Sequence, residues 1–124
     1  MRRDTLSSQF FENKYRYKSD PWEFASSDYE QSRYQVAFEA LKDHRYERAF
    51  EPGCSIGAFT ARLATICDRV EAMDISFTAA MRARERCKEL RNVNSTCGAV
   101  PTRMPSGSFD VMVMNEIGYY FDEE

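Results

Sequence analysis

The 124-residue sequence predicts an α/β domain built on a parallel β-sheet. Short apolar runs of strand length alternate with longer segments in which apolar residues recur at helical spacing. A turn with two glycines follows the first apolar run, and an acidic residue ends both the first run and the second. Such alternation is typical of parallel strands joined by crossover helices.

The first helix is predicted to begin near residue 28, with Ser27 or Asp28 as its N-cap. Its apolar positions recur at i, i+4 and i+7 and are Tyr34, Phe38 and Leu41. The preceding segment is polar and aromatic without a sustained period, and Pro21 would interrupt a helix there. We therefore expect one domain over residues 1–124, with an N-terminal segment and helix in 1–46 and a β-α-β-α-β-β core in 47–124.

Four strands are expected in this core, at residues 48–51, 69–74, 93–98 and 109–115. The last, "FDVMVMN", is the strongest strand signal because it is apolar on both faces, as a buried parallel strand should be. A helix marked by Phe59, Leu63 and Ile66 is expected after the first strand. A second, over about 77–91, would place on one face Ala80, Ala83, Cys87 and Leu90.

Composition argues against several classes of function. With 17 basic and 20 acidic residues, the chain lacks the basic excess that nucleic-acid binding requires. No apolar run approaches the roughly 20 residues of a membrane span, and no secretory signal is expected. One histidine and no C-x-x-C spacing disfavour a zinc site. We expect a cytoplasmic protein with reduced cysteines.

The turn after the first strand, "GCSIG", matches neither common phosphate-binding loop. It lacks the lysine of G-x-x-x-x-G-K-[ST], and its two glycines, Gly53 and Gly57, do not have G-x-G-x-x-G spacing. Glu51 precedes the first glycine by two residues, where a carboxylate would repel a pyrophosphate but suit an ammonium group. An ordinary β-α turn remains the alternative. Cys54 in the turn is either a redox group or a small residue tolerated there.

A second acid, Asp74, ends the second predicted strand 21 positions after Gly53. An acid about 20 residues beyond a glycine turn typically binds the ribose hydroxyls of a nucleoside. The alternative is an N-cap for the next helix, which Ser76 could equally supply. Parallel strands would bring Glu51, Asp74 and Asn115 to one edge of the sheet, where α/β proteins bind ligands.

Three stretches together resemble the successive motifs of class I S-adenosylmethionine-dependent methyltransferases: "FEPGCSIGAFTARLA", "VEAMDIS" and "SFDVMVMNEIGYYF". Within that class, the pattern is similar to the nodulation protein S-like N-methyltransferases. These have "DPW" before a "GC-x-x-G-x-F-T" loop, and a fourth strand that ends in "S/N-E-x-x-Y-Y". The resemblance covers nearly all of residues 10–121 and implies a Rossmann-like fold.

The resemblance implies S-adenosylmethionine as cofactor and assigns residues to its binding. Glu51 and the backbone of the loop Gly53, Cys54, Ser55 and Gly57 would face the methionine end. Asp74 would bind the ribose, and Ile75 would lie against the adenine. Trp22 and Asn115 complete the expected cofactor site. Ser55 replaces a glycine found in many members, and Ala99 replaces an aspartate that often contacts the adenine amine.

Two residues are the expected catalytic groups. Glu116 would orient an acceptor amine or take its proton, unless it is a solvated loop acid. Tyr119 would help to cover the substrate, with other aromatic residues that could instead simply pack: Tyr15, Tyr17 and Tyr120. The expected reaction is methylation of a nitrogen on a small molecule, an amino sugar being what the subgroup suggests.

The family fold continues with three more strands, whereas this sequence stops just after the fourth. We therefore expect a truncated form whose fourth strand exposes an apolar edge prone to self-association. The alternative function is a non-catalytic nucleotide-binding remnant that acts through association. A small NAD-binding domain is a third candidate, which the turn spacing and Glu51 disfavour.

Overall fold

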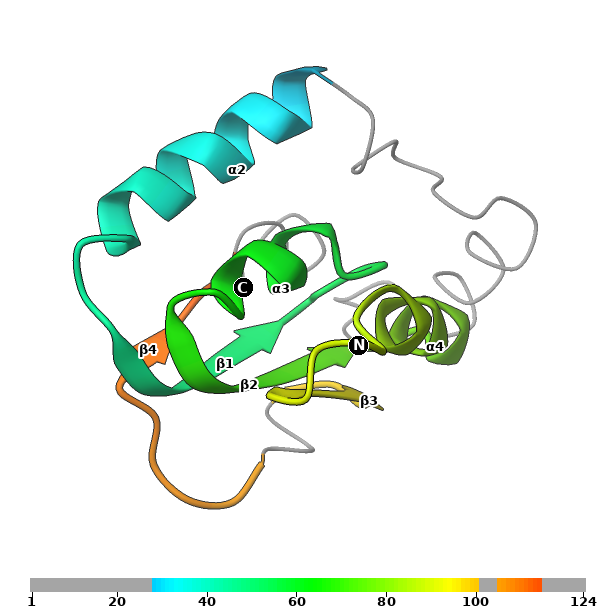
Figure 1. Cartoon of the computed structure of the whole chain (residues 1–124). Helices are drawn as coiled ribbons and strands as arrows, with labels where there is room; N and C mark the ends of the chain where they lie inside the picture. The colour runs from blue at the N-terminus through cyan, green and yellow to red at the C-terminus, as the bar shows by residue number, and fades with distance from the viewer. Residues whose placement is uncertain (1–27, 101–104, 115–124) are drawn as a thin grey trace, which may run out of the picture.

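The computed structural model describes residues 28–100 and 105–114 (Figure 1). The elements follow the order α2 (Asp28–Leu41), β1 (Tyr46–Pro52), α3 (Ala58–Leu63), β2 (Cys67–Asp74), α4 (Phe77–Arg86), β3 (Val93–Cys97) and β4 (Val111–Met112). The predicted sequence of elements is therefore confirmed for this part of the chain. None of the helices described is long and apolar enough to cross a membrane.

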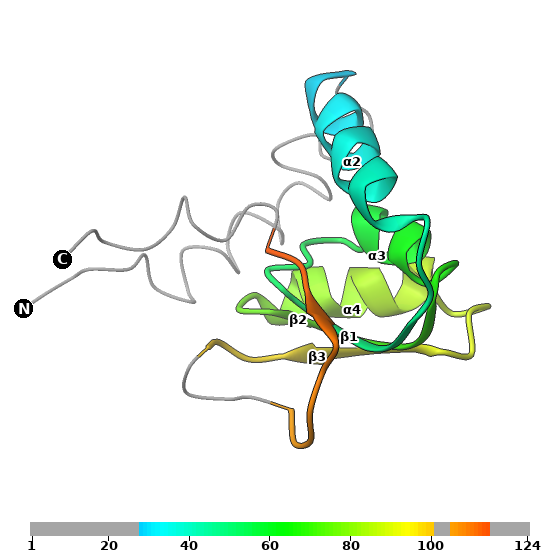
Figure 2. The same ribbon diagram turned by 90° about the vertical axis from the view of Figure 1, so that its left-hand side faces the viewer.

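The four strands form one parallel sheet in the order β3-β2-β1-β4. Register pairs Glu51 with Ala72, and Asp74 with Cys97. The three helices lie on the same face of this sheet (Figure 2). Two successive right-handed crossovers in one direction along a sheet place both connecting helices on one face, which accounts for α3 and α4.

Between the sheet and the helices lies an apolar core. Its fully buried members include Ala49, Phe59, Leu63, Cys67 and Val70. Three of the four residues expected on the apolar face of α4 are buried: Ala80, Ala83 and Cys87. The fourth, Leu90, lies beyond the end of the helix and is partly buried against the core. Small side chains on this face let α4 lie close to the sheet, which brings its first turn to the ends of β2 and β3.

Three predicted boundaries were wrong. Helix α3 ends at Leu63, and Ile66 follows it in a turn whose N–H donates to the carbonyl of Leu63. Helix α4 ends at Arg86 rather than 91, because Cys87 leaves helical geometry with φ −101° and ψ 16°. Strand β4 has two residues instead of seven.

The predicted burial of β4 on both faces was also wrong. Val113 is buried beside it, but Met112 and Met114 are 49% and 56% exposed. Among the described residues β4 pairs only with β1, so it lies at the rim of the sheet. An apolar pattern alone does not distinguish a central strand from an edge strand, because that difference depends on which neighbour is present.

The connection into β4 is fixed to β1 by charged and aromatic contacts. Asp110 accepts hydrogen bonds from the backbone N–H groups of Glu47 and Arg48, both at 2.8 Å. The Arg48 guanidinium lies 4.4 Å from the centre of the Phe109 ring, which stacks on Phe50 with centroids 5.2 Å apart. These contacts set the register of β4 against β1.

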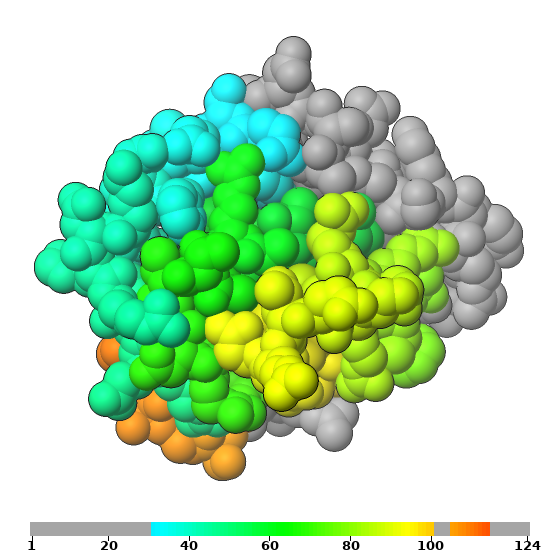
Figure 3. Space-filling model, viewed as in Figure 1, coloured from blue at the N-terminus to red at the C-terminus, as the bar shows by residue number. Residues whose placement is uncertain are grey.

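Helix α2 packs against α3, and its atoms adjoin the following part of the chain in the space-filling view (Figure 3). Tyr34 contacts Phe59 with ring centroids 5.5 Å apart. Arg62 of α3 donates to the side-chain oxygens of Gln31 and Gln35 at 2.6 and 3.1 Å. Contacts with α2 thus fix the position of α3. Since α3 begins directly after Gly57, they also help to position the glycine turn.

Gly57 places α3 against α4. Its φ of 89° is in the left-handed region, and an added Cβ would lie 3.0 Å from the Cα and Cβ of Ala83. We predict that Gly57→Ala lowers the free energy of unfolding by roughly 2 kcal/mol or more, through backbone strain plus overpacking. Urea-induced unfolding measures this change.

Gly107→Ala is the matched control for this prediction. Its φ is 94°, but its added Cβ would approach only the end of the flexible Arg48 side chain. The loss there should be smaller, about 1 kcal/mol from backbone strain plus the cost of moving the end of Arg48 from the Ser106 carbonyl. Equal losses in the two variants would mean that close helix packing at Gly57 contributes nothing.

Candidate functional site

The strand order reverses next to β1. From β1 the chain proceeds outward through β2 and β3, and then returns to add β4 on the other side of β1. Ligands of open α/β sheets bind beyond the carboxyl ends of the strands at such a point. The structure brings to this edge the predicted residues Glu51, Gly53, Cys54, Ser55, Gly57, Asp74 and Ile75. Four other predicted site residues lie outside the described residues: Trp22, Asn115, Glu116 and Tyr119.

Left-handed backbone shapes the loop from β1 to α3. Gly53, Ser55 and Gly57 have φ values of 74°, 56° and 89°. The conformation of Ser55 explains why a glycine would be favoured at this position, since a side chain there is strained by roughly 1 kcal/mol or more. In this loop the N–H of Cys54 donates to the Met73 carbonyl at 2.9 Å, and that of Gly57 to the Cys54 carbonyl at 3.0 Å.

Asp74 stabilises this loop directly. Its carboxylate accepts the N–H of Ser55 at 2.7 Å and the N–H of Ser76 at 3.0 Å, one on each oxygen. The side chain is 7% exposed, and burial raises its pKa to about 6 although the backbone hydrogen bonds act in the opposite direction. One acid therefore joins the loop after β1 to the turn after β2.

The N-cap of α4 is Ser76, whose hydroxyl accepts the N–H of Ala79 at 3.1 Å. Asp74 is therefore not needed as the cap of this helix. A carboxylate has about four acceptor positions, and two backbone bonds leave capacity for ligand hydroxyls. Ala99 follows the end of β3 at the same edge, next to Gly98, whose N–H donates to the Asp74 carbonyl at 2.9 Å.

Glu51 is a buried acid near the end of β1. It is 2% exposed, and the Thr60 hydroxyl of α3 donates to its Oε1 at 2.5 Å. Burial raises the pKa of Glu51 to about 8, with a smaller contribution from the negative charge of Asp74 and opposition from the Thr60 hydrogen bond. Such a carboxyl is protonated near neutral pH until a cation lies beside it.

Cys54 lies in the loop with a buried thiol, 3% exposed. Burial raises its pKa well above the usual value, and the charges of Asp74 and Glu51 add to this. Since the thiolate is the reactive form, the environment of Cys54 opposes a redox role and favours that of a small buried residue.

Two residues that hold the site were missed from the sequence. Thr60 ends the "GC-x-x-G-x-F-T" motif but was given no role, and the first turn of α3 directs it back to Glu51 of β1. Arg86 belongs to no predicted motif, but its Nε donates to the Ile56 carbonyl of the loop at 3.1 Å. Arg84 likewise donates to the Ser95 carbonyl at 3.1 Å. Side-chain length lets both arginines reach backbone acceptors on other elements.

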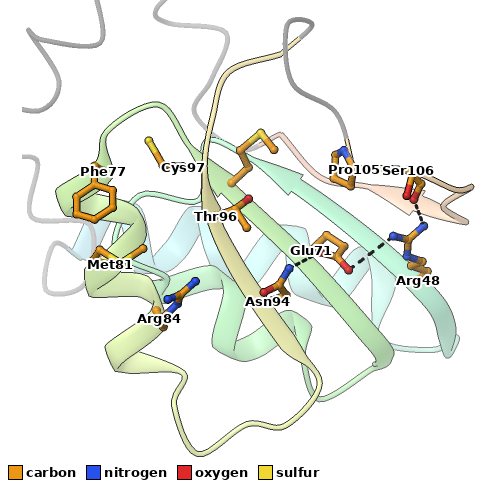
Figure 4. Close-up of a pocket in the computed structure, with 11 residues that line it drawn as sticks. Arg48, Glu71, Phe77, Met81, Arg84, Asn94, Thr96, Cys97, Pro105 and Ser106 are labelled. Carbon is orange, nitrogen blue, oxygen red and sulfur yellow. Dashed lines mark hydrogen bonds and ion pairs between the residues drawn. The ribbon is translucent and has the colours of Figure 1, made fainter.

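A shallow groove of about 650 Å³ runs along the sheet from Arg48 to the first turn of α4 (Figure 4). Its charges have partners within the protein. Glu71 lies 3.6 Å from the Arg48 guanidinium and accepts from Asn94 at 3.0 Å. Arg48 also donates to the Ser106 carbonyl at 2.6 Å. The groove is therefore balanced internally, unlike the two buried acids at the loop.

The parallel sheet with its reversed strand order and the left-handed glycine turn after β1 define a Rossmann-like domain. The family model described as "Nodulation protein S (NodS)" matches residues 7–124. This chain belongs to the nodulation protein S family. The family-level resemblance inferred from the motifs is thereby confirmed.

Similar proteins include nodulation protein S of Sinorhizobium fredii, 33% identical over 105 residues, and that of Bradyrhizobium diazoefficiens, 32% identical over 102 residues. These matches cover 84% and 82% of this chain but 49% of each relative. The chain thus spans about half the length of the curated relatives it matches.

Solved structures of methyltransferases are also similar to this chain. The N-methyltransferase NodS from Bradyrhizobium japonicum WM9, in complex with S-adenosyl-L-homocysteine, is 27% identical with a TM-score of 0.71 and covers 85% of this chain and 54% of that one. A putative methyltransferase from Pseudomonas syringae is 33% identical with a TM-score of 0.61, covering 68% and 54%. The Rossmann-like fold class is confirmed.

Burial of Glu51 makes stability depend on pH. The folded state keeps a proton on Glu51 up to about pH 8, whereas the unfolded chain loses it near 4.5. The unfolded state binds fewer protons in this window, so stability falls as pH rises, by up to about 1.4 kcal/mol per pH unit. We predict that this fall persists between pH 6 and 8, above the pKa of Asp74.

Glu51→Gln tests this prediction because glutamine keeps an oxygen for the Thr60 hydroxyl but cannot ionise. Denaturant unfolding at pH 6 and pH 8 should give a flatter dependence for the variant than for the wild type, and greater stability of the variant at pH 8. If the two proteins have the same slope, Glu51 is ionised throughout and the burial argument fails.

Proposed function

We propose that this chain is the cofactor-binding part of an S-adenosylmethionine-dependent methyltransferase that acts on a nitrogen of a small acceptor. The observation that carries the proposal is the pair of buried acids, Glu51 and Asp74, on either side of a left-handed glycine loop at the point of strand reversal. A nucleoside with an attached ammonium group matches both acids, because Asp74 offers acceptors for ribose hydroxyls and Glu51 has no cationic partner in the part of the chain that the structure describes.

The residues fit the cofactor in distinct ways. Glu51, with the loop backbone of Gly53, Cys54, Ser55 and Gly57, would hold the methionine end. Asp74 would accept the ribose hydroxyls with its remaining lone pairs. Ile75, directly after it, would lie against the adenine. Trp22 and Asn115 remain proposed members of the site.

The cofactor, when bound, supplies an electrophilic methyl group on a sulfonium. The protein's contribution is positioning, and well-placed reactants can contribute roughly 7 to 11 kcal/mol toward the barrier. The acceptor nitrogen needs a free lone pair, so a protonated amine must lose a proton first. Glu116 is the proposed group that orients this amine or takes its proton, and Tyr119 is proposed to cover it. The similar B. japonicum protein is an N-methyltransferase, which supports nitrogen as the acceptor atom; an amino sugar is the acceptor we favour.

The cofactor proposal is tested by calorimetry of the chain with S-adenosylhomocysteine and, separately, with NAD. We expect the first ligand to bind and the second not to. Asp74→Ala should weaken S-adenosylhomocysteine binding at least tenfold, about 1.4 kcal/mol. This variant loses ligand acceptors and releases the Ser55 N–H that shapes the loop.

Asp110→Ala is the control for Asp74→Ala. Asp110 also accepts two backbone N–H groups, but at the amino end of β1, away from the loop. Its removal should leave the affinity for S-adenosylhomocysteine unchanged. Unaltered binding in Asp74→Ala would remove Asp74 from the site, and preferential binding of NAD would replace the proposal by the dinucleotide alternative.

A second candidate is a nucleotide-binding protein that acts through association. Exposed Met112 and Met114 at the rim strand favour this candidate, since an apolar edge without charge invites pairing with another chain. Self-association through β4 is thus compatible with either function. The four cysteines are free, which supports our proposal of a reducing, cytoplasmic location.

Sedimentation velocity at micromolar concentration tests association through β4. We predict dimers or larger species for the wild type, and a shift toward monomer for Met112→Lys, because a charge at the rim opposes strand pairing. Val36→Lys is the control, since Val36 is 71% exposed on α2 and is not part of the rim strand. A wild type that stays monomeric would exclude this surface as an association site.

A further inference from the structure

The contact between Thr60 and Glu51 joins α3 to β1 in the interior of the candidate site. Thr60 is fully buried, at 0% exposure, and its hydroxyl lies 2.5 Å from Glu51 Oε1. A carboxyl oxygen can accept this hydroxyl whether or not the other oxygen of Glu51 carries a proton. Threonine is β-branched and has few side-chain rotamers, so the direction of its donor is fixed by the helix backbone. Glu51 is therefore held in one orientation.

No described group that acts electrostatically on Glu51 is a cation. The negative charge of Asp74 faces it from β2. The thiols of Cys54 in the loop and of Cys87, directly after α4, also interact electrostatically with Glu51. A buried carboxylate without a neighbouring cation is strongly disfavoured. Before a ligand binds, Glu51 must therefore carry a proton, and it can ionise only when a positive group lies beside it.

We infer that Thr60 is a positioning residue for the amino-acid end of the cofactor, and that Glu51 gives up one proton when an ammonium group binds beside it. The inference rests on the proposed function. The proton balance is simple: a carboxylic acid becomes a carboxylate, the ligand's ammonium keeps its protons, and the released proton goes to the buffer. Thr60 favours this exchange because its hydroxyl already donates to the oxygen that becomes charged.

The pKa of Glu51, raised to about 8 by burial, sets the pH window of this exchange. Below that pH, an ammonium-bearing ligand must displace a proton, so its affinity should rise with pH by up to about tenfold per unit. A nucleoside without the ammonium group does not require the exchange. Its affinity should be nearly independent of pH in the same range.

Two probes separate these cases: S-adenosylhomocysteine, and 5′-methylthioadenosine, which has the nucleoside but no amino-acid end. Calorimetry at pH 7 in two buffers of different ionisation enthalpy measures proton release directly. We expect close to one proton released with the first probe and close to none with the second. Affinity for the first should increase from pH 6.5 to pH 8.

Variants at Thr60 test the positioning role. Thr60→Val keeps the shape without the hydroxyl and should weaken S-adenosylhomocysteine binding about tenfold at pH 7, with binding of methylthioadenosine kept. It should also shift the rise in affinity to higher pH, because the hydrogen bond that favours the carboxylate is gone. Thr60→Ser restores the hydroxyl and should bind nearly as the wild type does. Thr65→Val removes an exposed hydroxyl that donates to the Arg62 carbonyl, and should change nothing at the site.

The outcomes distinguish this inference from the proposed function. If neither probe binds the wild type, the proposed function fails and this inference with it. If both probes bind but S-adenosylhomocysteine releases no proton, the proton exchange at Glu51 is wrong while the cofactor proposal stands. Equal losses for both probes in Thr60→Val would reduce Thr60 to a structural residue. Wild-type affinity and pH dependence in that variant would exclude any role.

Discussion

The candidate site depends on the Asp74 carboxylate, which connects two turns that are 19 residues apart in sequence. Parallel pairing of β1 with β2 brings both turns to one edge, where the N–H of Cys54 also donates to the Met73 carbonyl at 2.9 Å. Asp74 satisfies the N–H of Ser55 on one side and that of Ser76 on the other. Without this acceptor, the left-handed residue Ser55 would lose the hydrogen bond from its N–H to Asp74, which helps to offset its strain. The same carboxylate is therefore required for the loop's shape before any ligand arrives.

Helix packing restricts the loop from the other side. Gly57 touches Ala83 of α4 so closely that neither position tolerates a larger group without movement. Arg86, one turn beyond Ala83, donates to the carbonyl of Ile56. Helix α4 thus fixes the end of the loop while the end of β2 fixes its middle. A loop held at several points can present its backbone to a ligand without first being ordered, which lowers the entropic cost of binding.

The sequence was sufficient to predict the order of the elements and the proximity of Glu51, Gly53, Gly57 and Asp74. Hydrophobic periodicity and glycine spacing are local properties of the chain, so they can be recognised without knowledge of the tertiary structure. The sequence was insufficient where the outcome depends on a neighbour. Leu90 has the spacing of the α4 face, but the helix stops before it at Cys87. The run at 109–115 has the composition of a central strand, but β4 lies at the rim of the described sheet. Thr60 and Arg86 could not be selected because their importance comes from acceptors on other elements.

Charge balance distinguishes the two polar regions of the molecule and indicates what the site must receive. Along the groove, the buried carboxylate of Glu71 meets Arg48 and Asn94, so that region is complete as it stands. At the loop, Glu51 and Asp74 are buried next to each other, and burial raises the pKa of both. Two acids in a low-dielectric site repel each other, and the protein tolerates them only with a proton on one or with a cation between them. A ligand that brings hydroxyls alone would satisfy Asp74 and leave Glu51 protonated. A ligand that brings hydroxyls and a positive charge would satisfy both acids, and this requirement is the reason for our proposal of a nucleoside with an amino-acid end rather than a dinucleotide.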